Sequence, residues 1–159
     1  MSDPTDADVA ATERAPDAGA WIVRAAWSSV ALYAVVAVPF ALGVDALEGA
    51  AVAVSLGLFL VSLPVWIYAF LRAVGRTAAG DEIQVASLFF LAGSAPRRVR
   101  AHLLGATVVC IAIVAATAAS NPFGVLVPML PLGGAGLWGS IHGVFPPRPS
   151  RGGQRGGRR

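Results

Sequence analysis

Leu103–Pro147, LLGATVVCIAIVAATAASNPFGVLVPMLPLGGAGLWGSIHGVFPP, is a run of 45 residues without Asp, Glu, Lys or Arg. About 20 apolar residues in a helix, each rising 1.5 Å, cross the roughly 30 Å hydrocarbon layer of a membrane. The run is long enough for two crossings, and "SNP" at Ser120–Pro122 predicts the turn between them. We expect helices because an isolated apolar run in lipid satisfies its own backbone hydrogen bonds only as a helix.

Two shorter uncharged runs come earlier in the chain: Ala25–Val44 has 20 residues and Gly49–Leu71 has 23. Each predicts one further span. Only 13% of the residues are charged, against roughly 25% in an average soluble domain. The sequence therefore predicts an all-α membrane protein, with four transmembrane helices in two hairpins within a domain over residues 21–146. The spans are expected at about 22–44, 49–71, 101–119 and 123–142.

The two ends of the chain differ from this domain in composition. Residues 1–20 are rich in Asp and Ala and show no apolar periodicity, which predicts a disordered acidic tail. Residues 147–159 predict a disordered Arg/Gly-rich tail. On a membrane protein, anionic lipid headgroups are a nearer partner for such a tail than nucleic acid. We therefore expect lipid contacts and no nucleic-acid partner.

The distribution of arginine predicts the orientation. The two short turns between paired spans contain no Arg, and every Arg lies in the N-terminal flank, the central loop or the C-terminal tail. The positive-inside rule then predicts a multi-pass protein of the cell (plasma) membrane with both termini in the cytoplasm. The twelve are Arg14, Arg24, Arg72, Arg76, Arg97, Arg98, Arg100, Arg148, Arg151, Arg155, Arg158 and Arg159.

The central loop contains an apolar segment, GDEIQVASLFFLAG, at Gly80–Gly93. Asp81 is a candidate N-cap with Gln84 in the reciprocal position, and Gly93 ends the helix, so we predict a short helix over 82–92. It is too short to cross a membrane, and its apolar residues spread around the helix instead of forming one face.

Three interpretations of this loop helix remain open. It is sunk into the inner leaflet boundary or tucked under the bundle, it docks a partner subunit, or it is a re-entrant half-helix. The candidate docking residues are Leu88, Phe89, Phe90 and Leu91.

Three arginines follow at the cytoplasmic start of the third span. Arg97, Arg98 and Arg100 are candidate contacts for anionic lipid headgroups, at about 1 kcal/mol each. The alternative is that they act only as topology signals.

The fourth span contains two prolines, Pro128 and Pro131, each of which removes a backbone donor. We expect a kink or a partly unwound turn there. Broken helices form binding sites in many transporters, but neighbouring helices also repair purely structural kinks. Small residues four apart recur in both late spans, and they predict close packing of the third span on the fourth. These pairs are Ala112–Ala116, Ala115–Ala119, Ala135–Gly139 and Gly136–Ser140.

The chain offers little catalytic or metal-binding chemistry. No Asp, Glu, Lys or Arg lies inside a span, whereas intramembrane transport usually uses such a residue. Cys110 is the only cysteine, and the two histidines, His102 and His142, make a weak metal site without a carboxylate or thiolate. No nucleophile, base and oxyanion set can be assembled. We expect no enzyme activity, no metal and no cofactor.

The stretches GDEIQVASLFFLAGSAPRRVR and FGVLVPMLPLGGAGLWGSIHGVFPPRP resemble small uncharacterised four-span integral membrane proteins of actinobacterial type. The resemblance covers roughly Trp21 to Pro149 and implies a location, not a chemistry. The first functional hypothesis is a non-enzymatic accessory or interaction subunit of the cytoplasmic membrane, bound to a partner membrane protein. The alternative is a homo-oligomeric small-solute transporter or channel.

Overall fold

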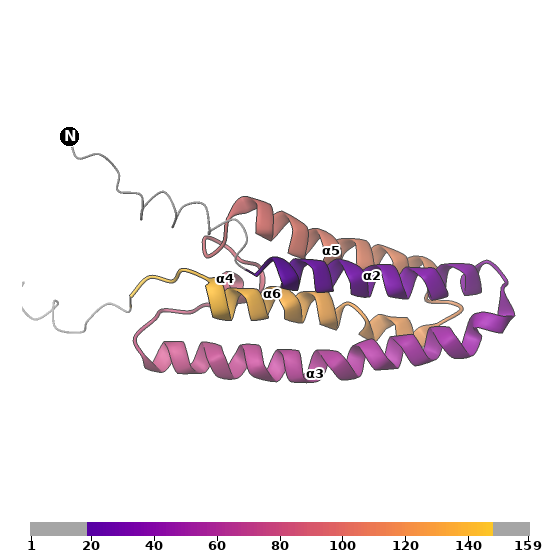
Figure 1. Ribbon diagram of the computed structural model, residues 1–159, viewed down its shortest axis with the longest axis horizontal. Helices are drawn as coiled ribbons and strands as arrows, with labels where there is room; N and C mark the ends of the chain where they lie inside the picture. Colours follow the sequence, from indigo (N-terminus) through magenta and orange to yellow (C-terminus); the bar gives the residue numbers. More distant parts are fainter. Residues whose placement is uncertain (1–18, 148–159) are drawn as a thin grey trace, which may run out of the picture.

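The computed structural model describes residues 19–147. Four helical segments are long and apolar enough to cross a membrane (Figure 1), so the predicted fold class, an all-α membrane protein, is confirmed. Three of them are continuous helices: α2 (Ala20–Ala41), α3 (Glu48–Ala78) and α5 (Arg97–Thr117). The fourth combines the 3₁₀ turn η3 (Pro122–Leu126) with α6 (Met129–His142).

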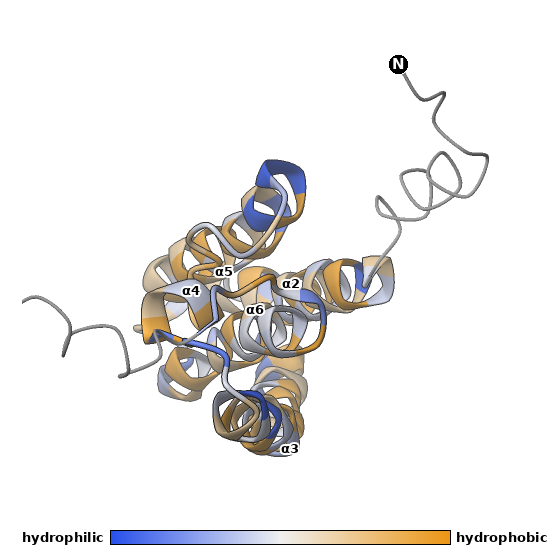
Figure 2. Cartoon of the chain, turned by 90° about the vertical axis from the view of Figure 1, so that its left-hand side faces the viewer, coloured by the Kyte–Doolittle hydropathy of each residue, from blue (hydrophilic) through white to orange (hydrophobic). Residues whose placement is uncertain are grey.

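Helix α6 forms the centre of the bundle. It packs against α2, α3, α5 and the short helix α4 (Val85–Phe89), as Figures 1 and 2 show. Of the 18-residue apolar stretch that defines the fourth span, 56% of the residues are buried, against 17% for the span that contains α3. A helix can occupy this position because Gly, Ala and Ser on α6 leave room for the side chains of its neighbours.

Both described ends of the chain lie at the same end of the bundle, where α2 and α5 begin and α3 and α6 end. The opposite end carries the two short connections. One contains the 3₁₀ turn η2 (Asp45–Leu47), and the other runs from α5 to η3 through Asn121, which is only 1% exposed. The two helical hairpins are thus present, although the second turn is folded into the bundle.

Several helix boundaries differ from the predicted ones. Helix α3 continues to Ala78, seven residues past the predicted 71. The predicted boundary marked the end of the apolar run, but the helix itself continues because arginine is a good helix former. Helix α5 begins at Arg97 instead of 101, since Pro96 is its N-cap.

Helix α4 covers only Val85–Phe89, so the predicted helix over 82–92 was too long. Its N-cap is Gln84, which forms a capping box with Ser87, and not Asp81. Asp81 is unavailable because its carboxylate pairs with Arg76. Of the predicted tails, 1–18 and 148–159 lie outside the described residues.

Candidate functional site

The described arginines gather at one end of the bundle, which we call the Arg-bearing end. It is the end where α2 and α5 begin and α3 and α6 end. Figure 2 views the bundle from this end. Hydrophilic residues lie at the near ends of α5 and α3, and the parts of the helices behind them are more apolar. The residues are Arg24, Arg72, Arg76, Arg97, Arg98 and Arg100.

The three arginines predicted to contact lipid form the start of α5. Arg97, Arg98 and Arg100 are all exposed, and the first turn contains no acidic residue. The N-terminus of a helix carries a partial positive charge, so these side chains add to a potential that is already positive. This part of the Arg-bearing end therefore suits a phosphate or another anion.

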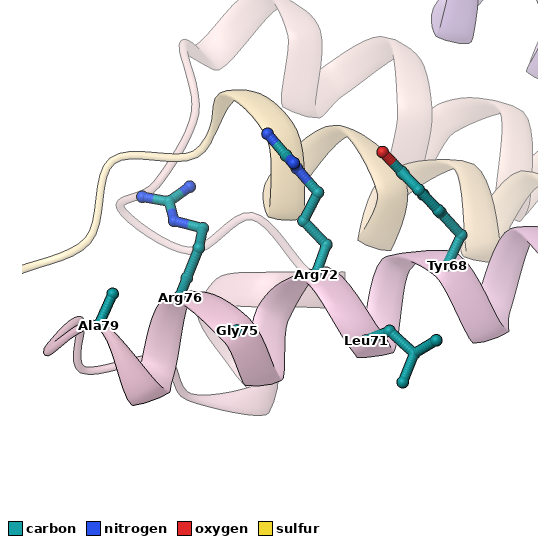
Figure 3. A pocket seen from close by; sticks show the side chains of 6 residues that line it. All are labelled: Tyr68, Leu71, Arg72, Gly75, Arg76 and Ala79. Carbon is teal, nitrogen blue, oxygen red and sulfur yellow. The ribbon is translucent and has the colours of Figure 1, made fainter.

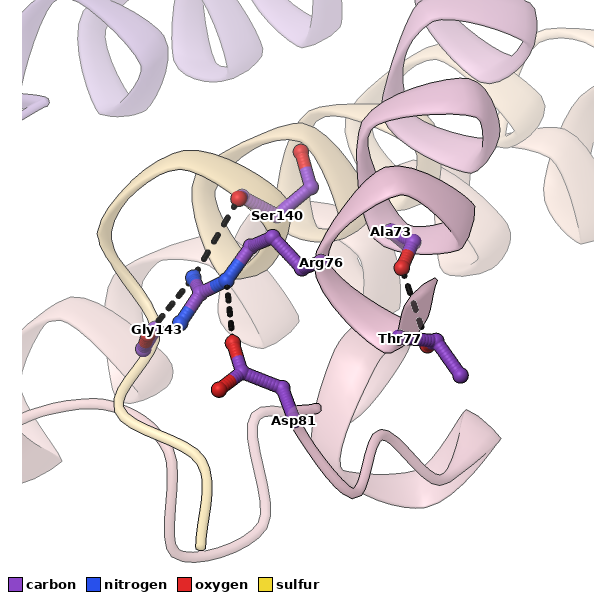
Figure 4. Close-up of polar contacts among 6 residues, drawn as sticks. All are labelled: Ala73, Arg76, Thr77, Asp81, Ser140 and Gly143. Atoms are coloured by element: carbon purple, nitrogen blue, oxygen red, sulfur yellow. Dashed lines mark hydrogen bonds and ion pairs between the residues drawn. The ribbon is translucent and has the colours of Figure 1, made fainter. Parts of the chain in front are cut away.

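Arg76 joins the end of α3 to the end of α6 (Figure 4). Its Nε donates to Asp81 Oδ2 at 2.8 Å, and its Nη1 donates to the carbonyl oxygens of Gly143 at 2.9 Å and Ser140 at 3.3 Å. The guanidinium carbon also lies 4.8 Å from the centre of the Phe145 ring. Helix C-termini leave carbonyls without partners and carry partial negative charge, so Arg76 caps α6 from the neighbouring helix.

The main chain reinforces this junction on both sides. The Glu82 N–H donates to the Pro146 carbonyl at 2.9 Å, and the Val144 N–H donates to the Ser94 carbonyl at 3.1 Å. The central loop and the segment after α6 are therefore bonded together. The sequence analysis used Arg76 only to predict orientation. The opposite charges of Arg76 and Asp81, five residues apart, were a signal that could have predicted this ion pair.

The four candidate docking residues separate into two groups. Leu88, Phe89 and Leu91 are buried inside this chain, whereas Phe90 is 53% exposed. The Phe89 ring stacks on Trp66 with centroids 4.5 Å apart. The loop helix is thus tucked under the bundle, and only Phe90 of the four can contact a partner without rearrangement.

The fourth span is broken at its prolines. The 3₁₀ turn η3 ends at Leu126, and α6 begins at Met129 with Pro128 as its N-cap. Pro131 lies in the first turn of α6. The Trp66 Nε1–H of α3 donates to the Met129 carbonyl at 2.7 Å. This bond joins α3 to the first residue of α6, directly beside the break.

Buried hydroxyl and amide groups bond to one another toward the opposite end. Tyr33 Oη and Thr117 Oγ1 lie 3.0 Å apart, and Asn121 Nδ2 donates to Ser55 Oγ at 2.9 Å. These pairs join α2 to α5 and the α5–η3 turn to α3, which makes them packing contacts across the bundle. Within residues 19–147 no three of His, Cys, Asp and Glu are grouped as a metal ion would need.

Comparison of the chain with protein-family models, with curated proteins and with solved structures finds no match.

Proposed function

We propose that this chain is a non-enzymatic accessory or interaction subunit of the cell membrane, with its Arg-bearing end and both termini in the cytoplasm. The observation that carries the proposal is the gathering of the described arginines at one end of an apolar four-span bundle. Arginine accumulates on the cytoplasmic side of membrane proteins. The proposal includes the resemblance to small actinobacterial four-span proteins, which implies the same location.

Two features of the Arg-bearing end support contacts there. The Arg76 junction holds the central loop against α6 and leaves Phe90 and Val85 of the loop exposed. Arg97, Arg98 and Arg100 stand free at the start of α5 and suit anionic lipid headgroups. The loop would present Phe90 to a partner membrane protein while the arginines contact lipid.

Cysteine labelling tests the orientation. In a Cys110→Ala background, Leu42→Cys reports on the turn end, where Leu42 is 80% exposed. Val85→Cys reports on the Arg-bearing end. A membrane-impermeant maleimide should label Leu42→Cys on intact cells and Val85→Cys only after permeabilisation. Labelling of Val85→Cys on intact cells would reverse the proposed orientation.

Purification in a gentle detergent tests the interaction role. We expect a second protein at fixed stoichiometry that is lost in Phe90→Ser. The matched control is Phe123→Ser, an exposed phenylalanine in η3 at the opposite end, which should retain the partner. A chain that purifies only with copies of itself contradicts the accessory role.

A homo-oligomeric transporter or channel is the second candidate, and the break in the fourth span favours it. Broken helices bring polar backbone to binding sites in transporters. In this chain the break lies against α3, where Trp66 bonds to Met129. Specific solute uptake into vesicles that contain the purified protein would support this candidate over the first.

A further inference from the structure

A groove lies along the last turns of α3 at the Arg-bearing end (Figure 3). Its volume is about 480 Å³, within the range of small-molecule sites. Figure 3 shows Tyr68, Arg72 and Arg76 projecting from the same side of α3, with Gly75 between the two arginines. A Cβ atom on Gly75 would meet nothing within 4 Å, so the space over this glycine is open. The lining residues are Tyr68, Leu71, Arg72, Gly75, Arg76 and Ala79.

The two arginines of the groove differ in their partners. Arg76 is held by Asp81 and by the carbonyls at the end of α6. Arg72 is exposed, and within residues 19–147 no carboxylate pairs with it. The groove therefore presents one guanidinium that lacks a counter-ion, beside a tyrosine hydroxyl one helical turn away.

The length of α3 gives the depth of this groove in a membrane. The rise from Gly49, where the apolar run begins, to Tyr68 is about 30 Å, the thickness of the hydrocarbon layer. Arg72 lies about 6 Å further along the helix, within the headgroup layer of roughly 5–8 Å on each side. Below it, the exposed side chain of Leu71 lies near the boundary and that of Ile67 reaches the hydrocarbon.

We propose that this groove binds one anionic phospholipid. Its phosphate contacts the Arg72 guanidinium and the Tyr68 hydroxyl, its headgroup lies over Gly75, and its acyl chains follow α3 past Leu71 and Ile67. Guanidinium is a strong partner for phosphate because the hydrogen bonds are charge-assisted. The inference deepens the proposed lipid contact of the Arg-bearing end and depends neither on its orientation nor on a partner protein.

Native mass spectrometry of the full chain in detergent tests this site, with phosphatidylglycerol and phosphatidylethanolamine as probes. We expect tighter binding of phosphatidylglycerol, and a loss of about fivefold in Arg72→Gln. Gly75→Leu should fill the groove and weaken binding by a similar factor. Both variants should melt close to the wild-type temperature, since a Cβ atom on Gly75 would meet nothing within 4 Å and the Arg72 side chain is exposed.

Arg100→Gln is the control, because it removes one charge from the same end outside the groove. It should change phosphatidylglycerol affinity by less than about twofold. Equal losses in Arg72→Gln and Arg100→Gln would refute the proposed site in the groove. Lipid binding would then reflect a general attraction to the charge of the Arg-bearing end. Equal binding of the two lipids by the wild type would overturn the groove as well. Failure of the groove proposal leaves the proposed orientation untouched, because cysteine labelling measures orientation independently of lipid binding.

Discussion

Gly139 lies directly against the main chain of Leu88. A Cβ atom on Gly139 would stand 2.5 Å from the Leu88 carbonyl oxygen. The same stripe of α6 receives the Trp66 side chain at Gly133 and the Phe89 ring at Gly136. These three glycines are therefore the surface on which α3 and the central loop pack, and they explain why α4 lies under the bundle.

Gly139→Ala should destabilise the protein by about 1–3 kcal/mol, because overpacking against backbone cannot be relieved by rotating a side chain. The free energy of unfolding, measured by denaturant titration in mixed micelles, checks this. Gly134→Ala is the control on the same helix, since its Cβ would lie 3.6 Å from Ile22, an ordinary contact. It should be as stable as wild type or more stable by up to about 1 kcal/mol, because alanine is the better helix former, and equal losses in the two variants would refute the packing argument.

Trp66→Phe should cost about 1 kcal/mol, because it removes the hydrogen bond to the Met129 carbonyl and retains a ring to stack on Phe89. The control is Trp21→Phe, whose side chain is 60% exposed at the start of α2. The same unfolding titration should separate the two variants. Wild-type stability in Trp66→Phe would mean that this hydrogen bond contributes nothing to holding α3 against the start of α6.

The four spans could be predicted because the thickness of the hydrocarbon layer imposes their length and excludes charge. The break at Pro128 could also be predicted from the sequence, since proline lacks a backbone donor wherever it lies. The third span does pack against the fourth, as predicted, but its alanine pairs do not lie on the packed face. Ala112, Ala115 and Ala116 are exposed, and α5 packs through a stripe that includes Leu103 and Cys110. Small residues four apart are frequent by chance in an Ala-rich chain and do not identify the packed face.

The central loop could not be predicted in detail because its structure depends on residues far along the chain. Phe89 is buried because Gly136 leaves a space for its ring. Asp81 fails to cap α4 because Arg76 binds it while also bonding to Gly143. Local sequence predicted a short helix but placed its end at 92 instead of Phe89, and Gly136 and Gly143 lie more than 45 residues further along the chain.

Leu91 has a left-handed backbone, with φ of 53°, and a side chain that is fully buried. That conformation costs most residues about 1–2 kcal/mol but costs glycine little. Leu91→Gly should therefore be as stable as Leu91→Ala or more stable, by about 1 kcal/mol. At Leu103, also fully buried but inside α5, the Gly variant should be about 1 kcal/mol less stable than the Ala variant. The same order at both positions would argue against a strained Leu91.

Arg76→Lys should loosen the junction between the central loop and the segment after α6. A lysine keeps the charge but lacks the planar fork that bonds Asp81 and Gly143 together. We expect hydrogen exchange at the amides of Glu82 and Val144, which bond across the junction, to become at least about fivefold faster, since hydrogen bonds to a charged group are among the stronger ones. Arg72→Lys, one turn earlier on α3, should leave both amides unchanged. Unaltered exchange in Arg76→Lys would show that the backbone bonds hold the junction without the guanidinium.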